Sequence, residues 1–284
     1  MRIVAFTLFG AAALQVRHVC SGDEACGRRS VMALHAAQEG DSAALTNVNM
    51  GLYVAEVELG TPKQVFTVLA DTGSGQFWVP SAECPSPACL TKQQYDPTLS
   101  SSSRPLSYNP VESVVYGTGK IMAKHVKDRV TFAGVTVENQ VVGTTVFEGP
   151  RPDSDWSPFE EMPFDGILGL AFARSYGVSR FNSVVESIFE EQALEDNFFS
   201  LYLSTNRHVP GSLVFGEIEP QYMASQDIVW VPSYGDRLWQ IAVDDFRVGD
   251  SSLGFVQAAV DSGTGVVSMS ERTYDAATNL FPIR

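Results

Sequence analysis

One short loop sequence occurs twice in this 284-residue chain, at residues 69–75 and at residues 259–265. Each copy has an apolar pair followed by Asp, a hydroxyl residue, Gly, a second hydroxyl residue and Gly. The glycines permit a tight turn after an apolar strand, which directs Asp71 and Asp261 outward, and the flanking hydroxyl groups can hydrogen-bond a carboxylate. Two such loops that face each other place two carboxylates side by side. The repeat therefore predicts a paired-carboxylate site to which two distant parts of the chain contribute.

The chain from residue 52 onward has the pattern of a β-protein. Short runs of β-forming residues are separated by Gly, Pro, Asn and Ser, and residues 53–59 alternate with a period of two before Gly60. One helix is expected, because Ser183 and Glu186 form a capping box ahead of an apolar face. The apolar positions of this helix are Val184, Val185, Ile188, Phe189 and Leu194. The sequence thus predicts an all-β fold with few helices.

Four further motifs stand in order between the two loops. They are Phe77-Trp78-Val79-Pro80-Ser81, the pair Cys84 and Cys89, Tyr116-Gly117-Thr118-Gly119, and Phe164-Asp165-Gly166-Ile167-Leu168-Gly169-Leu170-Ala171. Together with the loops, these motifs resemble the pepsin-like aspartic proteases, the eukaryotic two-lobed type, over residues 50–284. The resemblance implies a bilobal architecture of the double-psi β-barrel type, with an N-terminal lobe at 51–205 and an incomplete C-terminal lobe at 206–284.

The resemblance assigns the repeated loops a catalytic role. Asp71 and Asp261 are implied to be a dyad that shares one proton, because two adjacent carboxylates do not both ionise readily. One carboxyl group then acts as a base on a water molecule and the other acts as an acid on the peptide carbonyl, without a metal or a cofactor. The residues implied to support the two loops are Thr72, Gly73, Ser74, Ser262, Gly263 and Thr264.

The resemblance also assigns residues on the substrate side. Residues 114–121 are implied to form a β-hairpin flap that closes over bound peptide through Tyr116, Gly117 and Thr118, with a hydrogen bond between Tyr116 and Trp78. Three apolar residues are implied to line the pocket for the residue before the cut, which favours large apolar side chains there; they are Leu69, Phe164 and Ile167. Plain core packing is the alternative for each of these three.

Charge and the N-terminal residues limit the partners and the compartment. A formal net charge of −14 argues against nucleic acid as a partner, because binding phosphates requires a basic surface. Residues 1–22, with a basic start and a short apolar run, are interpreted as a signal peptide; a membrane anchor and a buried segment are the alternatives. Residues 23–50, which contain Arg28-Arg29 and no lysine, are interpreted as a short pro-segment. We expect a monomer that acts on peptides and is secreted or held in an acidic, lysosome-like or vacuole-like compartment, without a stable membrane span.

The cysteines fit the same compartment. Cys84 and Cys89 enclose only four residues, and we expect them to form a disulfide in an oxidising environment. A zinc site is not expected, because no histidine stands at ligand spacing from them. The pairing of Cys20 and Cys26 is left open.

The second half departs from the family pattern. Ile167, in the segment that crosses under the first loop, follows Asp71 by 96 residues, so its counterpart in the second lobe would lie near residue 357, past Arg284. We interpret the sequence as a fragment or an incomplete gene model, and expect the short chain to be inactive and poorly stable. A genuine noncatalytic form, an inactive pepsin-like module that binds peptide, is the alternative.

Overall fold

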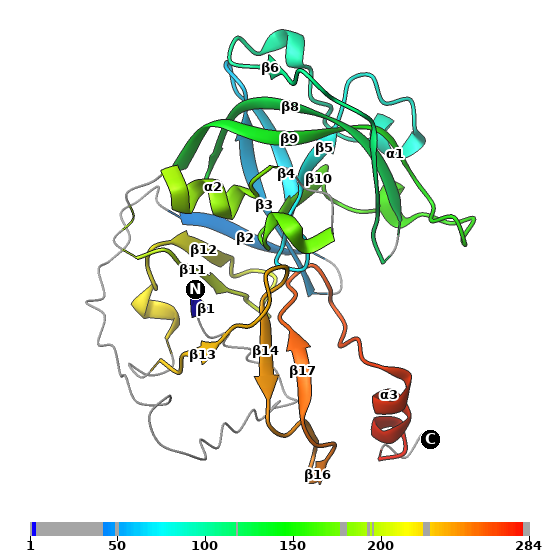
Figure 1. The fold of residues 1–284 in the computed structure, drawn as a ribbon, viewed down its shortest axis with the longest axis vertical. Coiled ribbons are helices and arrows are strands. Elements are labelled where there is room, and N and C mark those ends of the chain that lie inside the picture. Colours follow the sequence, from blue (N-terminus) through cyan, green and yellow to red (C-terminus); the bar gives the residue numbers. More distant parts are fainter. Residues whose placement is uncertain are drawn as a thin grey trace.

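The structure is a computed structural model that describes residues 2–3, 42–48, 51–117, 119–176, 181–191, 194, 196–223 and 228–280. Most of the expected signal peptide lies outside these residues, as do Cys20, Cys26, the Arg28-Arg29 pair and Thr118 of the flap. The fold is predominantly β, as predicted (Figure 1).

Six strands form a barrel in the N-terminal part of the molecule. In order of pairing they are β3 (Leu52–Leu59), β4 (Gln64–Asp71), β10 (Gly166–Gly169), β5 (Phe77–Pro80), β9 (Val135–Gly149) and β8 (Lys120–Phe132). A second pairing between β3 and β8, with Glu58 opposite Thr131 and Leu59 opposite Val130, closes the circuit. Strand β10 is inserted between β4, to which it runs parallel, and β5, to which it runs antiparallel. The crossing segment is therefore a central strand beside the first repeated loop.

The barrel closes around one apolar core. Its strands carry apolar residues at inward positions, because successive side chains of a strand point to opposite faces. Among the side chains with no measurable exposure are Val57, Leu59, Phe66, Val68, Val142 and Leu168. At about 25 cal/mol per Å² of apolar surface, burying side chains of this size provides the main driving force for folding.

Three more strands extend the sheet beyond β3. They are β2 (Ser42–Val48), β12 (Gly211–Phe215) and β11 (Phe199–Tyr202), in the order β11-β12-β2-β3. Strand β2 lies within the range assigned to the pro-segment, yet it pairs on both edges and buries Leu45 completely. These strands lie beneath the barrel in Figure 1.

Short elements complete the N-terminal part. Strands β6 (Arg104–Pro105) and β7 (Glu112–Val115) both pair with β8, and β7 with β8 forms the expected flap hairpin.

The capping box of helix α2 (Val184–Glu191) is confirmed, since the Ser183 amide donates to Glu186 at 2.9 Å and the Glu186 amide donates to Ser183 at 3.3 Å. The other helical elements described up to residue 223 are α1 (Pro87–Leu90), η2 (Pro97–Leu99), η3 (Pro158–Glu160), η4 (Ala173–Tyr176) and η5 (Pro220–Tyr222).

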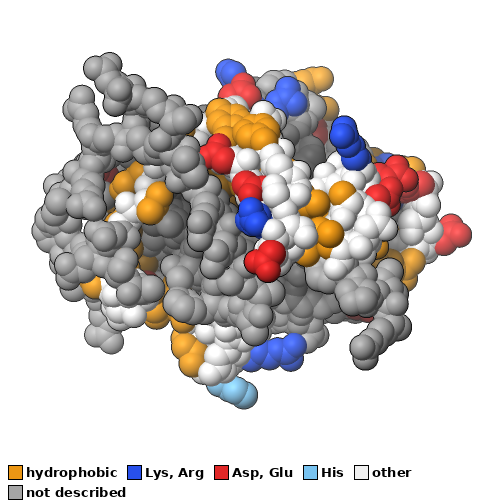
Figure 2. Space-filling model, turned by 90° about the horizontal axis from the view of Figure 1, so that it is seen from below, with side chains coloured by type: hydrophobic (Ala, Val, Ile, Leu, Met, Phe, Trp, Pro, Cys, Tyr) orange, Lys and Arg blue, Asp and Glu red, His pale blue; other side chains and the backbone are white. Residues whose placement is uncertain are grey.

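The C-terminal part consists of small sheets. Its elements are β13 (Val231–Pro232), which pairs with β1 (Arg2–Ile3), β14 (Gln240–Val243) with β17 (Val256–Ala259), β15 (Arg247–Val248) with β16 (Ser251–Ser252), and α3 (Glu271–Thr278). Large apolar side chains are exposed here, namely Phe255, Val266, Val267 and Tyr274. Figure 2 views the molecule from this end and shows hydrophobic side chains at the surface among charged ones. Within the described residues, no helix has the length and apolarity needed to cross a membrane.

Candidate active site

The first repeated loop follows the buried strand β4 and holds Asp71 at its end. The Asp71 side chain is only 6% exposed. The Gly73 amide donates to Oδ1 at 2.8 Å and the Ser74 hydroxyl donates to Oδ2 at 2.5 Å. Three amides of the crossing segment also bond this loop, those of Gly169, Leu170 and Ala171, which donate to the carbonyls of Gln76, Asp71 and Ser74. The first carboxylate is thus fixed by its own turn and by a neighbouring strand.

The second repeated loop contacts the first through a reciprocal exchange of hydrogen bonds. The Thr72 amide donates to the Ser262 hydroxyl at 3.0 Å, and the Ser262 amide donates to the Thr72 hydroxyl at 2.9 Å. Each hydroxyl also donates across to a main-chain carbonyl, Thr72 to Val260 at 2.9 Å and Ser262 to Ala70 at 2.6 Å. The two loops meet between the barrel and the β14–β17 pair in Figure 1.

This exchange brings the two Asp side chains together. A Cβ atom added to Gly73 would overlap the Asp261 carboxylate, and one added to Gly263 would overlap the Asp71 carboxylate. Burial and then the negative charge of Asp261 raise the pKa of Asp71 to about 7, although the bonds from Ser74 and Gly73 oppose the shift. The glycines therefore provide space for the opposite carboxylate in addition to permitting the turn.

The second loop has weaker support than the first. The Gly263 amide donates to Asp261 Oδ1 at 2.7 Å, which matches the first loop, but Asp261 itself is exposed. The Thr264 hydroxyl donates to the Val266 carbonyl at 3.4 Å, whereas the resemblance implies a bond to the outer oxygen of Asp261. A physical reason is that no strand among the described residues crosses under this loop, so residues 264–266 turn on themselves.

The residues expected on the substrate side gather in a second apolar cluster. Trp78 Nε1 donates to the Tyr116 hydroxyl at 2.7 Å. Both rings pack with Leu69, Phe164 and Ile167, each of which is about 5% exposed. These three side chains pack within the protein, and their contact with substrate stays a prediction. Gly117 lies at the exposed tip of the flap.

Phe159 belongs to the same cluster, but the sequence did not identify it as a site residue. Its ring centroid lies 5.8 Å from that of Trp78 and 6.4 Å from that of Tyr116. A Cβ atom at Gly119 would overlap this ring, so the flap glycine is needed for close packing. Phe159 follows Ser157-Pro158 in a loop without periodicity, and no sequence signal distinguishes it from a surface aromatic residue.

Cys84 and Cys89 form a disulfide, as predicted, with a Cα–Cα distance of 6.0 Å.

A buried carboxyl group, that of Glu148, lies next to this cluster. Burial raises the pKa of Glu148 to about 7, while its bond from Thr145 and the charge of Lys92 oppose the shift. Lys92 donates to the Phe164 carbonyl at 2.6 Å. Glu148 was also missed, because its surroundings come from distant parts of the chain.

The chemistry of the site rests on two adjacent carboxyl groups. Among the described residues, no group of three or more His, Cys, Asp or Glu side chains could hold a metal ion. Two adjacent carboxyl groups that share one proton can act together as a base and an acid. The arrangement can therefore activate a water molecule placed between them.

Comparisons with known proteins find related sequences over most of the chain. The family profile described as eukaryotic aspartyl protease matches residues 52–281. Pepsin A of Gallus gallus is 35% identical over 234 residues, which cover 81% of this chain and 61% of that protein. Cathepsin E-B of Xenopus laevis is 36% identical over 221 residues, which cover 76% of this chain and 53% of that protein. The chain thus spans between about half and three fifths of the length of these relatives.

Proposed function

This chain belongs to the eukaryotic aspartyl protease family, and on that premise we propose that Asp71 and Asp261 are the catalytic dyad of an aspartic endopeptidase. The observation that carries the proposal is the reciprocal bonding of Thr72 and Ser262, which brings a buried Asp71 with a raised pKa against Asp261. The substrate is a peptide or protein.

The dyad works in its singly protonated form. The ionised carboxyl group removes a proton from a water molecule, and the resulting hydroxide attacks the carbonyl carbon of the peptide bond while the other carboxyl group protonates the carbonyl oxygen. When the tetrahedral gem-diol collapses, a dyad proton passes to the leaving nitrogen and the C–N bond breaks. One diol hydroxyl gives its proton to the ionised carboxyl group as the carbonyl re-forms, which restores the singly protonated pair. The proton belongs to the pair, so neither Asp is assigned as the sole acid.

The neighbouring residues supply orientation and selectivity. Ser74 and Gly73 fix Asp71, and Gly263 fixes Asp261. The apolar cluster around Leu69, Phe164 and Ile167 favours a large apolar side chain at the cut. Acid keeps one proton on the dyad, so we expect activity at acid pH. Such activity fits a protein that is secreted or held in an acidic compartment. We expect the protein to act as a monomer.

An inactive peptide-binding module is the second candidate. One observation favours it: Asp261 is exposed, and the Thr264 hydroxyl bonds Val266 rather than Asp261. Such a module would bind a peptide beneath the flap without cleaving it.

Cleavage of a peptide library at pH 3 to 8 by the purified full-length protein tests the choice. We expect cleavage that a statine-type transition-state mimic blocks, and a loss of at least about 100-fold in Asp71→Asn and in Asp261→Asn. Cleavage that persists in either variant, or that a metal chelator blocks, would contradict the dyad. Binding of the mimic without cleavage would favour the inactive module.

A further inference from the structure

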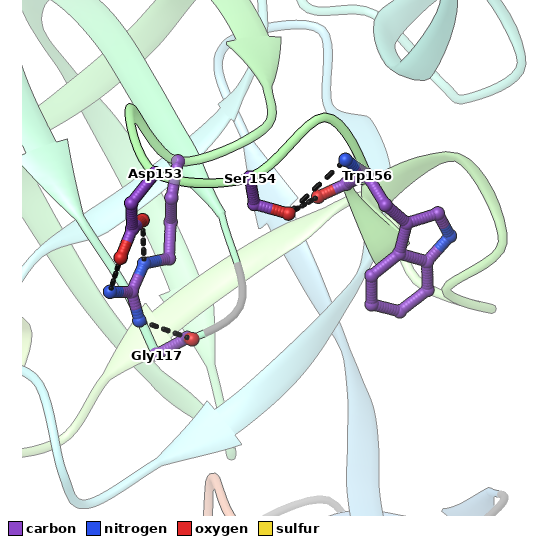
Figure 3. A network of polar contacts seen from close by, with 5 residues as sticks. Gly117, Asp153, Ser154 and Trp156 are labelled. Atoms are coloured by element: carbon purple, nitrogen blue, oxygen red, sulfur yellow. Dashed lines mark hydrogen bonds and ion pairs between the residues drawn. The ribbon is translucent and has the colours of Figure 1, made fainter.

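The loop between β9 and β10 contacts the flap at two places. At its far end Phe159 packs against Tyr116, as described above. At its near end Arg151 Nη1 donates to the main-chain carbonyl of Gly117, at a distance of 3.0 Å (Figure 3). Gly117 lies at the tip of the flap hairpin, where a Cβ atom would find nothing within 4 Å. The tip therefore has open surroundings and a polar tether from a different part of the chain.

Asp153 holds the Arg151 side chain in the orientation that this tether needs. Arg151 Nε lies 2.9 Å from Asp153 Oδ1, and Nη2 lies 2.7 Å from Oδ2. A guanidinium bound through two parallel hydrogen bonds has a fixed plane. The remaining nitrogen, Nη1, then donates to the Gly117 carbonyl. The bonds from Arg151 also lower the pKa of Asp153, which favours the ionised form that pairs with the guanidinium.

The tether complements a second bond beside the flap tip. There the Trp78–Tyr116 bond, at 2.7 Å, holds the hairpin from the barrel side. The turn itself is closed by the Tyr116 amide, which donates to the Gly119 carbonyl at 2.8 Å. With Arg151 bonded to Gly117, two adjacent residues of the tip are held by two different parts of the chain before a peptide arrives. Ordering a loop on binding costs free energy, and a loop that is already ordered avoids this cost.

We infer that Arg151 is a positioning residue for the flap, and that Asp153 orients it. The pair holds the flap tip in the position from which it contacts substrate, so its loss weakens substrate binding and leaves the chemical step unchanged. The inference about substrate rests on the proposed endopeptidase function. The inference about the flap itself depends only on the contacts of Arg151.

The test compares Arg151→Ala and Asp153→Asn with Arg129→Ala. Arg129 is a matched control on β8, because its side chain is 44% exposed against 38% for Arg151 and it pairs with Glu138 at 3.4 Å. Amide hydrogen exchange, followed by mass spectrometry of a fragment that contains residues 112–121, measures the flap without any need for activity. Peptide cleavage supplies KM and kcat.

We expect Arg151→Ala to raise flap exchange about 3- to 10-fold and KM by a similar factor, with kcat within about twofold of wild type, since one solvent-exposed hydrogen bond is lost. Asp153→Asn should move both quantities in the same direction by less, and Arg129→Ala should move neither. Unchanged flap exchange in Arg151→Ala, or the same increase in Arg129→Ala, would overturn the inference. So would a fall in kcat at constant KM. If wild type cleaves nothing, the proposed function fails, and flap exchange alone decides whether Arg151 positions the flap.

Discussion

Thr72 and Ser262 are 190 residues apart, yet each donates its amide to the hydroxyl of the other, at 3.0 and 2.9 Å. Both side chains are almost fully buried. The exchange is therefore a structural requirement for the paired carboxylates, because it fixes the distance between the loops on which they stand.

Removal of one of these hydroxyl groups should destabilise the protein. Ser262→Ala leaves the buried Thr72 amide and the Ala70 carbonyl without their partner, and each unsatisfied group costs about 1–3 kcal/mol. We expect a loss of roughly 2–6 kcal/mol in the free energy of unfolding. Ser262→Thr keeps the hydroxyl and is the matched control. Urea denaturation checks this, and equal midpoints for the two variants would contradict it.

The pH dependence of cleavage should follow the dyad. Because burial and Asp261 raise the pKa of Asp71 to about 7, the singly protonated pair persists through mildly acidic pH and is lost as pH rises through about 7. We therefore predict that kcat/KM falls above this pH. A pH–rate profile checks this, together with a denaturation measurement that shows whether the protein is folded at each pH. A folded protein that gains activity from pH 7 to 9 would exclude this role for the pair.

Glu148 should make the fold more stable in acid. Its pKa is raised to about 7 in the folded protein from a model-compound value of 4.5, so the folded state holds more protons than the unfolded state between these values. Stability then falls as pH rises through this window, by on the order of 3 kcal/mol, and is constant again above it. Glu148→Gln should flatten this dependence, although Asp71 retains a slope of the same sign.

The measurement is urea denaturation at pH 4.5 and pH 7.5. Glu138→Gln is the control, because Glu138 is an exposed carboxylate on the same strand, with a side chain that is 62% exposed. An identical pH dependence in wild type and Glu148→Gln would show that Glu148 does not carry the effect.

Local sequence patterns predicted the parts of the structure that local physics determines. The repeated loops, the capping box at Ser183 and the alternation in residues 53–59 are all readable without tertiary contacts, and the described structure contains a tight turn, a capped helix and a strand at these places. The disulfide between Cys84 and Cys89 follows from their short spacing.

Residues whose role depends on distant contacts were not predictable in the same way. Glu148 stands near the end of a strand where a carboxylate is expected to face solvent, and it is buried because Ser86 and Lys92 come from another segment. Arg151 and Phe159 lie in a loop without periodicity, so only the folded chain reveals their contacts with the flap. The hydrogen bond of Thr264 also differs from the expected one: its hydroxyl bonds the Val266 carbonyl rather than Asp261, and no strand among the described residues crosses beneath its loop.

Strand β2 bears on where a pro-segment can be removed. Leu45 is fully buried, and β2 connects β12 to β3, so the loss of residues 42–48 would open the sheet between them. We therefore predict that any maturation cut lies before Ser42. Amino-terminal sequencing of the processed protein checks this, and a mature chain that starts after Val48 would contradict it.

The same strand should contribute strongly to stability. We expect Leu45→Ala to cost about 2–5 kcal/mol, because it leaves a cavity in the core. Thr46→Ala, at the adjacent exposed position, should change stability by less than about 0.5 kcal/mol. Denaturation midpoints of the two variants compare a buried and an exposed side chain on one strand. If Leu45→Ala is no less stable than Thr46→Ala, β2 is not part of the cooperative fold, and a cut within 42–48 becomes compatible with a stable mature protein.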